Sequence, residues 1–262
     1  MRNVKELFSL EDKIAIVTGG RGLYGHSISL GLCEMGATVV IASRNGEKCE
    51  ELAKELREQG YQAIGMSLDL SDDASIRNFV KDVIDRYGRI DILVNNAVDR
   101  RNNVSLSDAT REMLQDSANT NLNGQLMLSQ AVLEYMVPAG KGNIINISSM
   151  RGIDCPHFPY YEKDQPINYT TEKWAMVGMT KYMAGRYGKD NIRVNCIAPG
   201  GYYDGPATVP GGGFYQTYID NCPLHRWANE EDIKGPVCFL ASDASGYVTG
   251  ATLVMDGGWT IW

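Results

Sequence analysis

Short β-branched runs alternate with longer stretches of helical periodicity along most of this 262-residue sequence. The runs that predict strands cover residues 13–18, 38–43, 63–70, 91–97, 143–149, 192–200 and 251–258. Between them, apolar residues recur at helical spacing over residues 27–35, 46–58, 73–87, 110–137, 169–187 and 230–242. Strands that alternate with helices in this way form βαβ crossovers. The sequence therefore predicts an α/β fold, a doubly wound parallel sheet in a three-layer α/β/α sandwich.

Two long segments interrupt this alternation, at residues 150–168 and 201–229. Connections of about 2–6 residues are usual in such folds. Each segment follows the carboxyl end of a predicted strand, where parallel sheets bind their ligands. Because α/β units of roughly 200–250 residues are often single domains, we expect one domain over residues 1–262, with these two segments as substrate loops.

Composition excludes several classes of protein. The chain is 44% hydrophobic and 22% charged, values that permit a packed core and argue against disorder. Its net charge is −7 and its basic residues are scattered, so nucleic acid is not an expected partner. Apolar runs are shorter than a membrane helix needs and no signal peptide is evident, which predicts a cytoplasmic protein. The six cysteines show no metal-ligand or disulfide pattern and are expected to be reduced, with no metal bound.

A glycine-rich turn joins the first predicted strand to the first helix, in the sequence TGGRGLYG. Glycines in this position let backbone N–H groups approach a pyrophosphate, and the helix N-terminus adds partial positive charge. The alternative is that the glycines serve only a tight turn. The strand–turn–helix context favours a dinucleotide site.

The second predicted strand ends in Ser43-Arg44, where a carboxylate that binds the ribose of NAD would otherwise be expected. A guanidinium suits the 2′-phosphate of NADP, and Arg21 in the glycine turn can supply a second cation. We therefore favour NADP. The alternative is that Arg44 is solvated at the surface and that neutral groups hold NAD.

These motifs, with Asn95-Asn96-Ala97, Asn121 in NTNLNG, Ser149 in NISSMRG, YTTEK and the terminal FLASDASGYVTGATLVMDGGW, occur in one order along the chain. Over residues 10–259 the chain resembles a short-chain dehydrogenase/reductase of the single-domain, Rossmann-like type, and it is similar to the bacterial sugar-acid and polyol dehydrogenases. The resemblance implies a nicotinamide cofactor. It assigns cofactor binding to Gly19, Arg21, Gly22, Leu23, Tyr24, Ser43, Arg44, Asp69, Leu70, Asn96, Ala97, Tyr169, Lys173, Pro199, Gly200 and Tyr202.

Tyr169 and Lys173 lie four residues apart, on one face of a predicted helix. A phenol with a pKa near 10 is a poor base at neutral pH unless positive charge stabilises its phenolate, and the lysine can supply that charge. By resemblance, the catalytic set is Asn121, Ser149, Tyr169 and Lys173: Ser149 binds the reacting oxygen, and Asn121 positions a water in a proton relay. The alternatives are a buried tyrosine beside a snorkelling lysine, and an amide that caps the backbone.

The catalytic serine and the catalytic tyrosine each have to be chosen among neighbouring candidates. Ser148 and Ser149 are adjacent on a strand and face opposite sides, and the family pattern selects Ser149. Tyr160 and Tyr161 stand nearer the family's usual spacing from the serine than Tyr169 does, but neither has a lysine four residues later. The family's usual threonine that contacts the carboxamide is replaced by Asp204.

The two long segments are rich in polar and aromatic residues that can line a substrate pocket. We expect substrate contacts from Arg151, His157, Tyr161 and Tyr203. Such a lining favours a sugar, polyol, sugar acid or small keto acid as the small-molecule substrate. The alternative is that these residues tie the loops together or form a subunit contact.

The leading hypothesis is an NAD(P)-dependent oxidoreductase that interconverts a polar ketone or aldehyde and its alcohol, with tyrosine as general acid/base. One alternative is a non-catalytic protein that binds nicotinamide nucleotides, and another is a reductase of a more apolar carbonyl. A nucleotide-dependent epimerase or dehydratase is disfavoured because such relatives carry an added substrate domain.

Two helical stretches carry more apolar residues than one sheet face needs, at Leu126, Leu128, Val132, Leu133, Met136, Trp174, Met176, Met179 and Met183. Exposed apolar helix faces are typical of subunit interfaces. Together with the family's habit of forming dimers or tetramers, this predicts a homo-oligomer. Trp259 and Trp262 are expected to pack against a neighbouring subunit.

Overall fold

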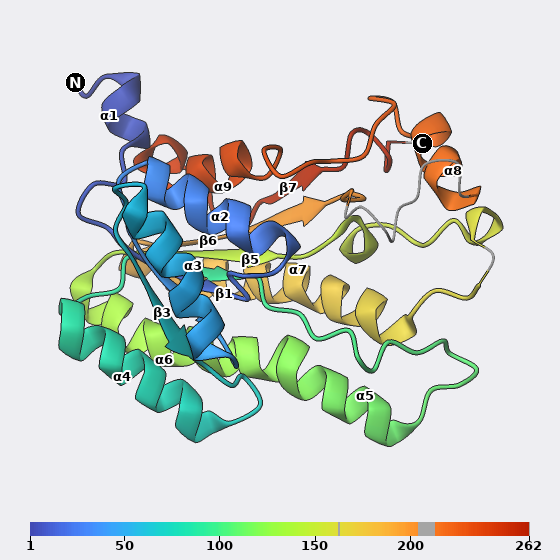
Figure 1. The fold of residues 1–262 in the computed structure, drawn as a ribbon, viewed down its shortest axis with the longest axis horizontal. Coiled ribbons are helices and arrows are strands. Elements are labelled where there is room, and N and C mark those ends of the chain that lie inside the picture. Colours follow the sequence, from blue (N-terminus) through green and yellow to red (C-terminus); the bar gives the residue numbers. More distant parts are fainter. Residues whose placement is uncertain (162, 204–212, 262) are drawn as a thin grey trace.

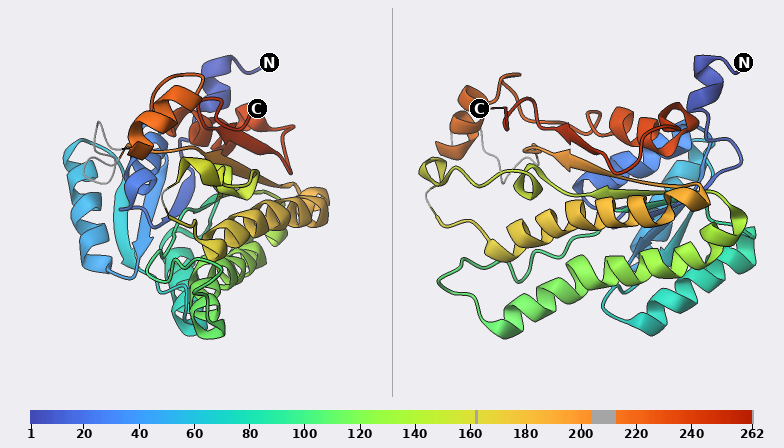
Figure 2. Two further views of the ribbon diagram at one scale, coloured as in Figure 1. Left: turned by 90° about the vertical axis from the view of Figure 1, so that its right-hand side faces the viewer. Right: turned by 180° about the vertical axis from the view of Figure 1, so that it is seen from behind.

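The computed structural model describes residues 1–161, 163–203 and 213–261. Within these residues, one sheet of parallel strands lies between two layers of helices (Figure 1, Figure 2). The strand order is β3-β2-β1-β4-β5-β6-β7. The chain moves outward from β1 in one direction, then returns to pair β4 with the other edge of β1. This reversal confirms the predicted doubly wound sheet and places a crevice beyond the carboxyl ends of β1 and β4.

The described strands coincide with the predicted apolar runs, although most are shorter. They are β1 (Ile14–Thr18), β2 (Thr38–Ser43), β3 (Ala63–Ser67), β4 (Ile92–Asn95), β5 (Gly142–Ile147), β6 (Ile192–Pro199) and β7 (Thr252–Met255). The central strands are buried along nearly their whole length because helices cover both faces of the sheet. This explains why their sequences are continuous apolar runs without alternation.

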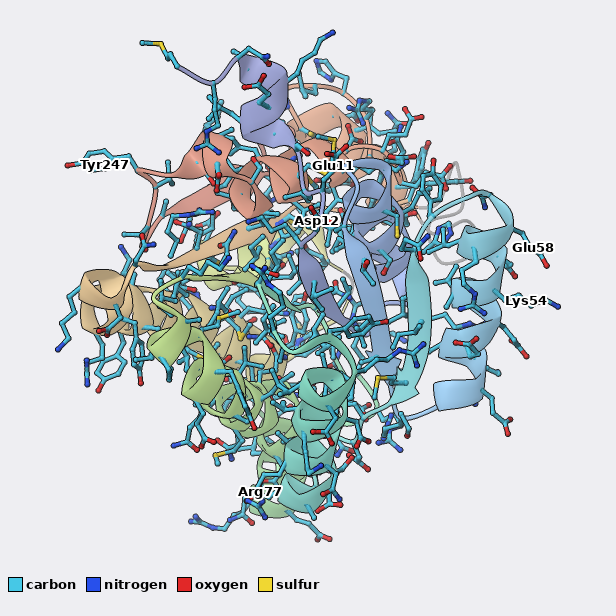
Figure 3. All side chains as sticks on the ribbon, turned by 90° about the vertical axis from the view of Figure 1, so that its left-hand side faces the viewer. Glu11, Asp12, Lys54, Glu58, Arg77 and Tyr247 are labelled. Carbon is cyan, nitrogen blue, oxygen red and sulfur yellow. The ribbon has the colours of Figure 1, made fainter. Side chains whose placement is uncertain are left out.

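Two apolar cores lie on opposite faces of the sheet. One contains residues of α2 (Leu23–Glu34), α3 (Gly46–Glu58) and α9 (Lys234–Ala241). The other contains residues of α4 (Asp73–Tyr87), α6 (Gly124–Ala139) and α7 (Ile167–Tyr187). The outer face of α3 is charged, and Figure 3 shows Lys54 and Glu58 pointing away from the sheet, one helical turn apart. A short helix, α1 (Val4–Phe8), precedes the sheet.

The sequence predicts one helical stretch over residues 110–137, but the structure has three consecutive pieces there. It consists of α5 (Arg111–Ala118), a π-helical turn over Asn119–Asn123, and α6. A π turn inserts one extra residue and interrupts the i→i−4 hydrogen bonds, so that a side chain can turn away from its regular helical direction. The side chain turned inward here is that of Asn121, which is buried.

A small aromatic cluster lies beyond the carboxyl ends of the strands, apart from the two main cores. It comprises Met150, Tyr218, Cys222, Trp227 and Trp259. Most of it comes from α8 (Gly213–Asn221), a helix that the sequence reasoning missed inside segment 201–229, and from the residues around it. In Figure 1, β6 and β7 point toward α8 and the segment that follows β5. The cluster therefore anchors the two long segments to each other.

The predicted subunit contacts need correction. Trp259 is buried within its own chain, stacked on Tyr218 with ring centroids 4.6 Å apart. Trp262 lies outside the described residues. Most of the apolar residues on the two long helices are internal, because α6 and α7 pack flat against the sheet; the buried ones are Leu128, Val132, Leu133, Met136, Met176, Met179 and Met183. Only Leu126 and Trp174 of that set stay exposed.

The described residues hold no helix long and apolar enough to cross a membrane. Among the same residues, no group of three or more His, Cys, Asp or Glu side chains is placed to hold a metal ion. All six cysteines are free, and five of them are buried.

Candidate active site

A cavity of about 740 Å³ lies at the carboxyl ends of the strands, beyond the neighbouring strands β1 and β4. It collects most of the residues that the sequence reasoning singled out. Those on its wall are Gly19, Gly22, Leu23, Tyr24, Asn96, Ala97, Ser149, Arg151, Tyr161, Tyr169, Lys173, Pro199, Gly200 and Tyr202. These residues come from segments spread over most of the sequence, and the parallel sheet brings them together because every strand ends at the same edge.

The glycine turn forms one end of this cavity and is tightly packed. Gly19 has a φ of +61°, and a Cβ there would lie 2.8 Å from the Cα of Ala97. A Cβ at Gly25 would overlap the carbonyl oxygen of Gly19. The side chain of Asn96 donates to the carbonyl oxygens of Thr18 and Gly19, at 3.0 and 3.1 Å, and so fixes the turn. Replacing either glycine by a larger residue would displace the backbone of the turn and not only side chains.

The N-terminus of α2 opens onto this end of the cavity. Its N-cap is Gly22, which has no side chain to satisfy the first N–H groups of the helix. The hydroxyl of Tyr24, which also lines the cavity, is buried without a hydrogen-bond partner among the described residues. Free N–H groups and an unpartnered hydroxyl beside a glycine cradle fit the pyrophosphate of a dinucleotide.

A second cavity of about 120 Å³ adjoins the turn, between the ends of β1, β2 and β3. Ser43, Arg44, Leu68 and Leu70 line it, as expected for an adenine pocket with a cation at its rim. Arg44 is half-exposed, and its guanidinium lies 3.2 Å from the carboxylate of Asp99. It therefore remains accessible to an anion at the mouth of this cavity.

Two predicted cofactor residues lie off the walls of both cavities. The carboxylate of Asp69 accepts hydrogen bonds from the backbone and hydroxyl of Ser71, at 2.9 and 2.6 Å. Those bonds lower the pKa of Asp69. Arg21 is exposed and lines neither cavity. The structure therefore gives Asp69 a local turn-forming role.

Tyr169 and Lys173 face the cavity from α7. The ammonium of Lys173 lies 5.6 Å from the centre of the Tyr169 ring and donates to the carbonyl oxygen of Ile147 at 2.8 Å. Burial raises the pKa of the phenol, but Lys173, Arg100 and a hydrogen bond with Ser149 outweigh it, so that the pKa lies below its ordinary value. Burial also lowers the pKa of Lys173, while the phenol opposes that shift. This environment stabilises phenolate.

Ser148 and Ser149 point in opposite directions, and only Ser149 reaches the phenol. The hydroxyl of Ser148 donates to the carbonyl oxygen of Lys173 at 2.7 Å and so ties the strand to α7. The hydroxyl of Ser149 lies close enough to the phenol to lower the pKa of Tyr169, and it accepts from the backbone N–H of Arg151 at 3.2 Å. The arrangement agrees with the choice of Ser149 made from the sequence.

Asn121 lies behind the cavity, not on its wall, and its amide is fully engaged. Its nitrogen donates to the carbonyl oxygen of Asp99 at 2.8 Å and to the carboxylate of Glu172 at 2.9 Å. Its oxygen accepts from the backbone N–H of Asp99 at 2.7 Å. The side chain thus joins the π turn, the loop after β4 and α7.

Arg100 is a site residue that sequence reasoning missed. Its guanidinium carbon lies 5.5 Å from the centre of the Tyr169 ring, and it lines the same cavity. Sequence reasoning also missed Glu172, which precedes Lys173 on α7. Its side chain is buried and accepts a hydrogen bond from Asn121. The sequence shows the dipeptide Arg100-Arg101 after β4, but only the fold shows that Arg100 lines the cavity while Arg101 pairs with Asp99.

The long segment after β5 contributes only some of the expected substrate residues. Arg151 and Tyr161 line the cavity. His157 is exposed and contacts Tyr160, with ring centroids 4.2 Å apart, and Tyr203 is exposed next to Tyr215. Neither lies on the cavity wall. Asp204 lies outside the described residues.

Comparison with known proteins agrees with this geometry. A family model described as enoyl-(acyl carrier protein) reductase matches residues 22–260. The chain belongs to the short-chain dehydrogenase/reductase family. It is 34% identical over 255 residues to 3-oxoacyl-(acyl-carrier-protein) reductase FabG of Thermotoga maritima, which covers 96% of this chain and 99% of the relative.

Two further relatives are sugar-acid dehydrogenases. Gluconate 5-dehydrogenase of Gluconobacter oxydans is 33% identical over 262 residues, covering 98% of both chains. The crystal structure of a gluconate 5-dehydrogenase from Burkholderia cenocepacia, in complex with NADP and tartrate, superposes with a TM-score of 0.91. That structure is 33% identical in sequence and covers 99% of this chain and all of its own. Short-chain dehydrogenases of the kind that these relatives represent interconvert alcohols and carbonyls with a nicotinamide cofactor.

Proposed function

We propose that this protein is an NADP-dependent oxidoreductase that interconverts a polar ketone or aldehyde and the corresponding alcohol. The observation that carries the proposal is the environment of Tyr169. Its phenol lines an open cavity beside the glycine turn, with Lys173, Arg100 and Ser149 lowering its pKa. A non-catalytic nucleotide-binding protein has no need for an acid/base group tuned in this way.

The cofactor is held in this proposal by the glycine turn and the adjoining cavity. The N–H groups at the start of α2 face the pyrophosphate, Leu68 and Leu70 enclose the adenine, and Arg44 binds the 2′-phosphate. On the far side, Pro199, Gly200 and Tyr202 border the nicotinamide. Support for NADP comes from the half-exposed cation at Arg44, on the wall of the smaller cavity, and from the NADP found in the Burkholderia relative.

The nicotinamide, when bound, supplies or accepts the hydride. Tyr169 transfers the proton: as phenol it donates to the carbonyl oxygen, and as phenolate it accepts from the alcohol. Lys173 stabilises the phenolate by its positive charge, and the Ser149 hydroxyl hydrogen-bonds to the reacting oxygen. Asn121 fixes the loop after β4 against α7 and thereby holds these groups in register.

A polar substrate is favoured by the side of the cavity that faces away from the glycine turn. Asn103, Gln165 and Thr170 add amide and hydroxyl groups to the wall beside Tyr169. These groups suit hydroxyl-bearing substrates. The sugar-acid relatives and the tartrate in the Burkholderia structure support the same class. The substrate class is a sugar, polyol, sugar acid or small keto acid.

The test is a substrate panel monitored at the nicotinamide absorbance band. The panel holds polyols, aldonic acids and keto acids, with an acyl thioester and a hydroxysteroid as apolar members. We expect turnover with polar members and NADP(H). Tyr169→Phe should bind NADPH as wild type does but lose turnover by about 1,000-fold or more, because only the proton-transferring hydroxyl is removed. Tyr247→Phe, on a fully exposed tyrosine (Figure 3), is the control and should change neither property. Undiminished turnover by Tyr169→Phe would exclude this mechanism.

We also propose that the chain forms a homo-oligomer, a dimer or tetramer, through the outer faces of α5, α6 and α7. Exposed apolar side chains remain there after folding, among them Leu114, Leu126, Trp174 and Tyr182. Exposed apolar clusters of this kind are typical of subunit interfaces. Light scattering behind a sizing column should give a small multiple of 28.9 kDa, and a monomer at micromolar concentration would reject the proposal.

A cytoplasmic location completes the proposal. The six free cysteines support a reducing compartment, because paired thiols are usual in oxidising ones. Fractionation of the source cells, with detection by antibody, tests this directly.

A further inference from the structure

Arg151 is buried on the wall of the main cavity. It belongs to the 3₁₀ turn Met150–Gly152, which follows β5 directly, and only 7% of its surface is exposed. Its guanidinium carbon lies 4.9 Å from the centre of the Tyr161 ring. The turn is rigid, because a Cβ at Gly152 would overlap the backbone of Lys173. The backbone at Arg151 is therefore held against α7, and the Tyr161 ring packs against its guanidinium.

The guanidinium of Arg151 lies over the Tyr161 ring but has no anionic partner among the described residues. Its backbone N–H donates to Ser149, but its guanidinium makes no hydrogen bond or ion pair with them. Burial lowers the pKa of Arg151, opposed by Tyr169, Asp154, Cys155 and Tyr218, which are the titratable groups around it. Removing a cation from water without an anionic partner destabilises a fold. A side chain kept in such a place serves something other than stability.

The second unpartnered group beside it is the hydroxyl of Tyr161. This oxygen is buried and has no hydrogen-bond partner among the described residues. Both side chains line the cavity that also contains Tyr169. A cation without an anionic partner and a hydroxyl without a hydrogen-bond partner, both judged on the described residues, thus lie near the phenol that carries out proton transfer in the proposed function.

We propose that Arg151 binds a carboxylate of the substrate, so that the enzyme acts on hydroxy acids and keto acids in preference to neutral polyols and carbonyls. This inference rests on the proposed function for the position of the reacting carbon at Tyr169. A guanidinium offers two parallel N–H groups to a carboxylate, a pairing that gives orientation as well as affinity. The chain has a net charge of −7, so an anionic substrate needs such a local cation.

The first experiment compares D-gluconate with D-glucitol, two substrates of equal length that differ by a carboxylate in place of a hydroxymethyl group. For Arg151→Met, kcat/KM for gluconate should fall by about 100-fold, whereas that for glucitol should change less than about 3-fold. Arg151→Lys should recover part of the loss, because it restores the charge without the bidentate geometry. Equal losses for both substrates, or a wild-type preference for glucitol, would overturn the assignment.

The second experiment measures binding without turnover, so that failure of this inference is separable from failure of the proposed function. Malonate should raise the Tm of the wild type but not that of Arg151→Met. Without malonate, Arg151→Met should unfold no lower than the wild type, because an unpaired buried charge has been removed. A lower Tm for this variant would show instead that Arg151 holds Tyr161 in place. Protection by inorganic phosphate but not by malonate would reject the carboxylate.

Discussion

Backbone forms one end of the cavity, and side chains form the other. The cofactor side, formed by residues 19–25 and 96–98, consists mainly of backbone in short turns held by close glycine contacts. The substrate side, formed by Arg151, Tyr161, Phe214 and Trp227, consists of side chains from long segments packed on a small aromatic cluster. Backbone sites tolerate little substitution, whereas side-chain sites can change specificity residue by residue.

This difference between a backbone wall and a side-chain wall suits the ligand that each side binds in the proposed function. Every member of a family with one cofactor needs the same N–H groups at the same place, and a strand–turn–helix unit supplies them locally. The substrate varies among relatives, and here the substrate side is formed by two separate segments. They contact each other through Tyr160 with Asn221 and Tyr161 with Phe214, and they pack on the cluster of Tyr218, Trp227 and Trp259. The two sides should therefore respond independently to substitution.

The largest expected effect is on the aromatic cluster. Trp259→Ala should lower the free energy of unfolding by about 3–5 kcal/mol, because it leaves a cavity against Tyr218. Substrate KM should rise, while NADPH affinity should stay within about 3-fold of the wild type, since no cluster residue forms the glycine turn. Denaturant unfolding and NADPH fluorescence titration measure both. The control is Tyr247→Ala, on a side chain that projects into solvent. Equal losses of substrate and NADPH affinity would show that the two sides of the cavity do not respond independently.

The next effect is on the cofactor side. Gly25→Ala should weaken NADPH binding by about 100-fold, because its Cβ overlaps the carbonyl of Gly19 and displaces the turn. Gly178→Ala is the matched control: it lies within α7 with nothing near its Cβ position, and it should leave binding unchanged. Normal affinity in Gly25→Ala, measured by titration, would mean that the turn adapts and that backbone geometry does not define this side.

A smaller effect is expected where the cofactor side uses a side chain. Arg44→Asp should shift the ratio of kcat/KM values from NADPH toward NADH by about 30-fold, because a guanidinium beside the 2′-phosphate becomes a repelling carboxylate. Arg77→Asp, on the outer surface of α4 (Figure 3), serves as the control. An unchanged ratio would show that Arg44 serves only its ion pair with Asp99.

The smallest effect is on proton transfer. Arg100→Gln removes a cation that stabilises the Tyr169 phenolate, so the pKa of Tyr169 should rise. Alcohol oxidation requires phenolate, and the rising limb of its pH–kcat/KM profile should therefore move to higher pH. Arg77→Gln should leave the profile in place. A shift to lower pH would contradict the sign of this interaction.

The sequence was sufficient for the sheet and for most of the cofactor side. Strand positions followed from buried apolar runs, and α3 and α4 begin and end where predicted. The sequence did not reveal the π turn at Asn119–Asn123, because its periodicity differs from an α-helix by one residue. It also gave no sign of α8, whose aromatic residues belong to a local cluster and not to a sheet-facing stripe.

Local interactions determine the glycine turn and the placement of Tyr169 and Lys173 on one helix face, so the sequence by itself determined them. Only the tertiary structure decided which arginines face the cavity. Arg100 and Arg151 line the cavity, whereas Arg21 and Arg101 do not, and no local pattern separates the two pairs. The direction of a long side chain at the end of a strand depends on contacts from distant segments, here α7 and the segment that carries Tyr161.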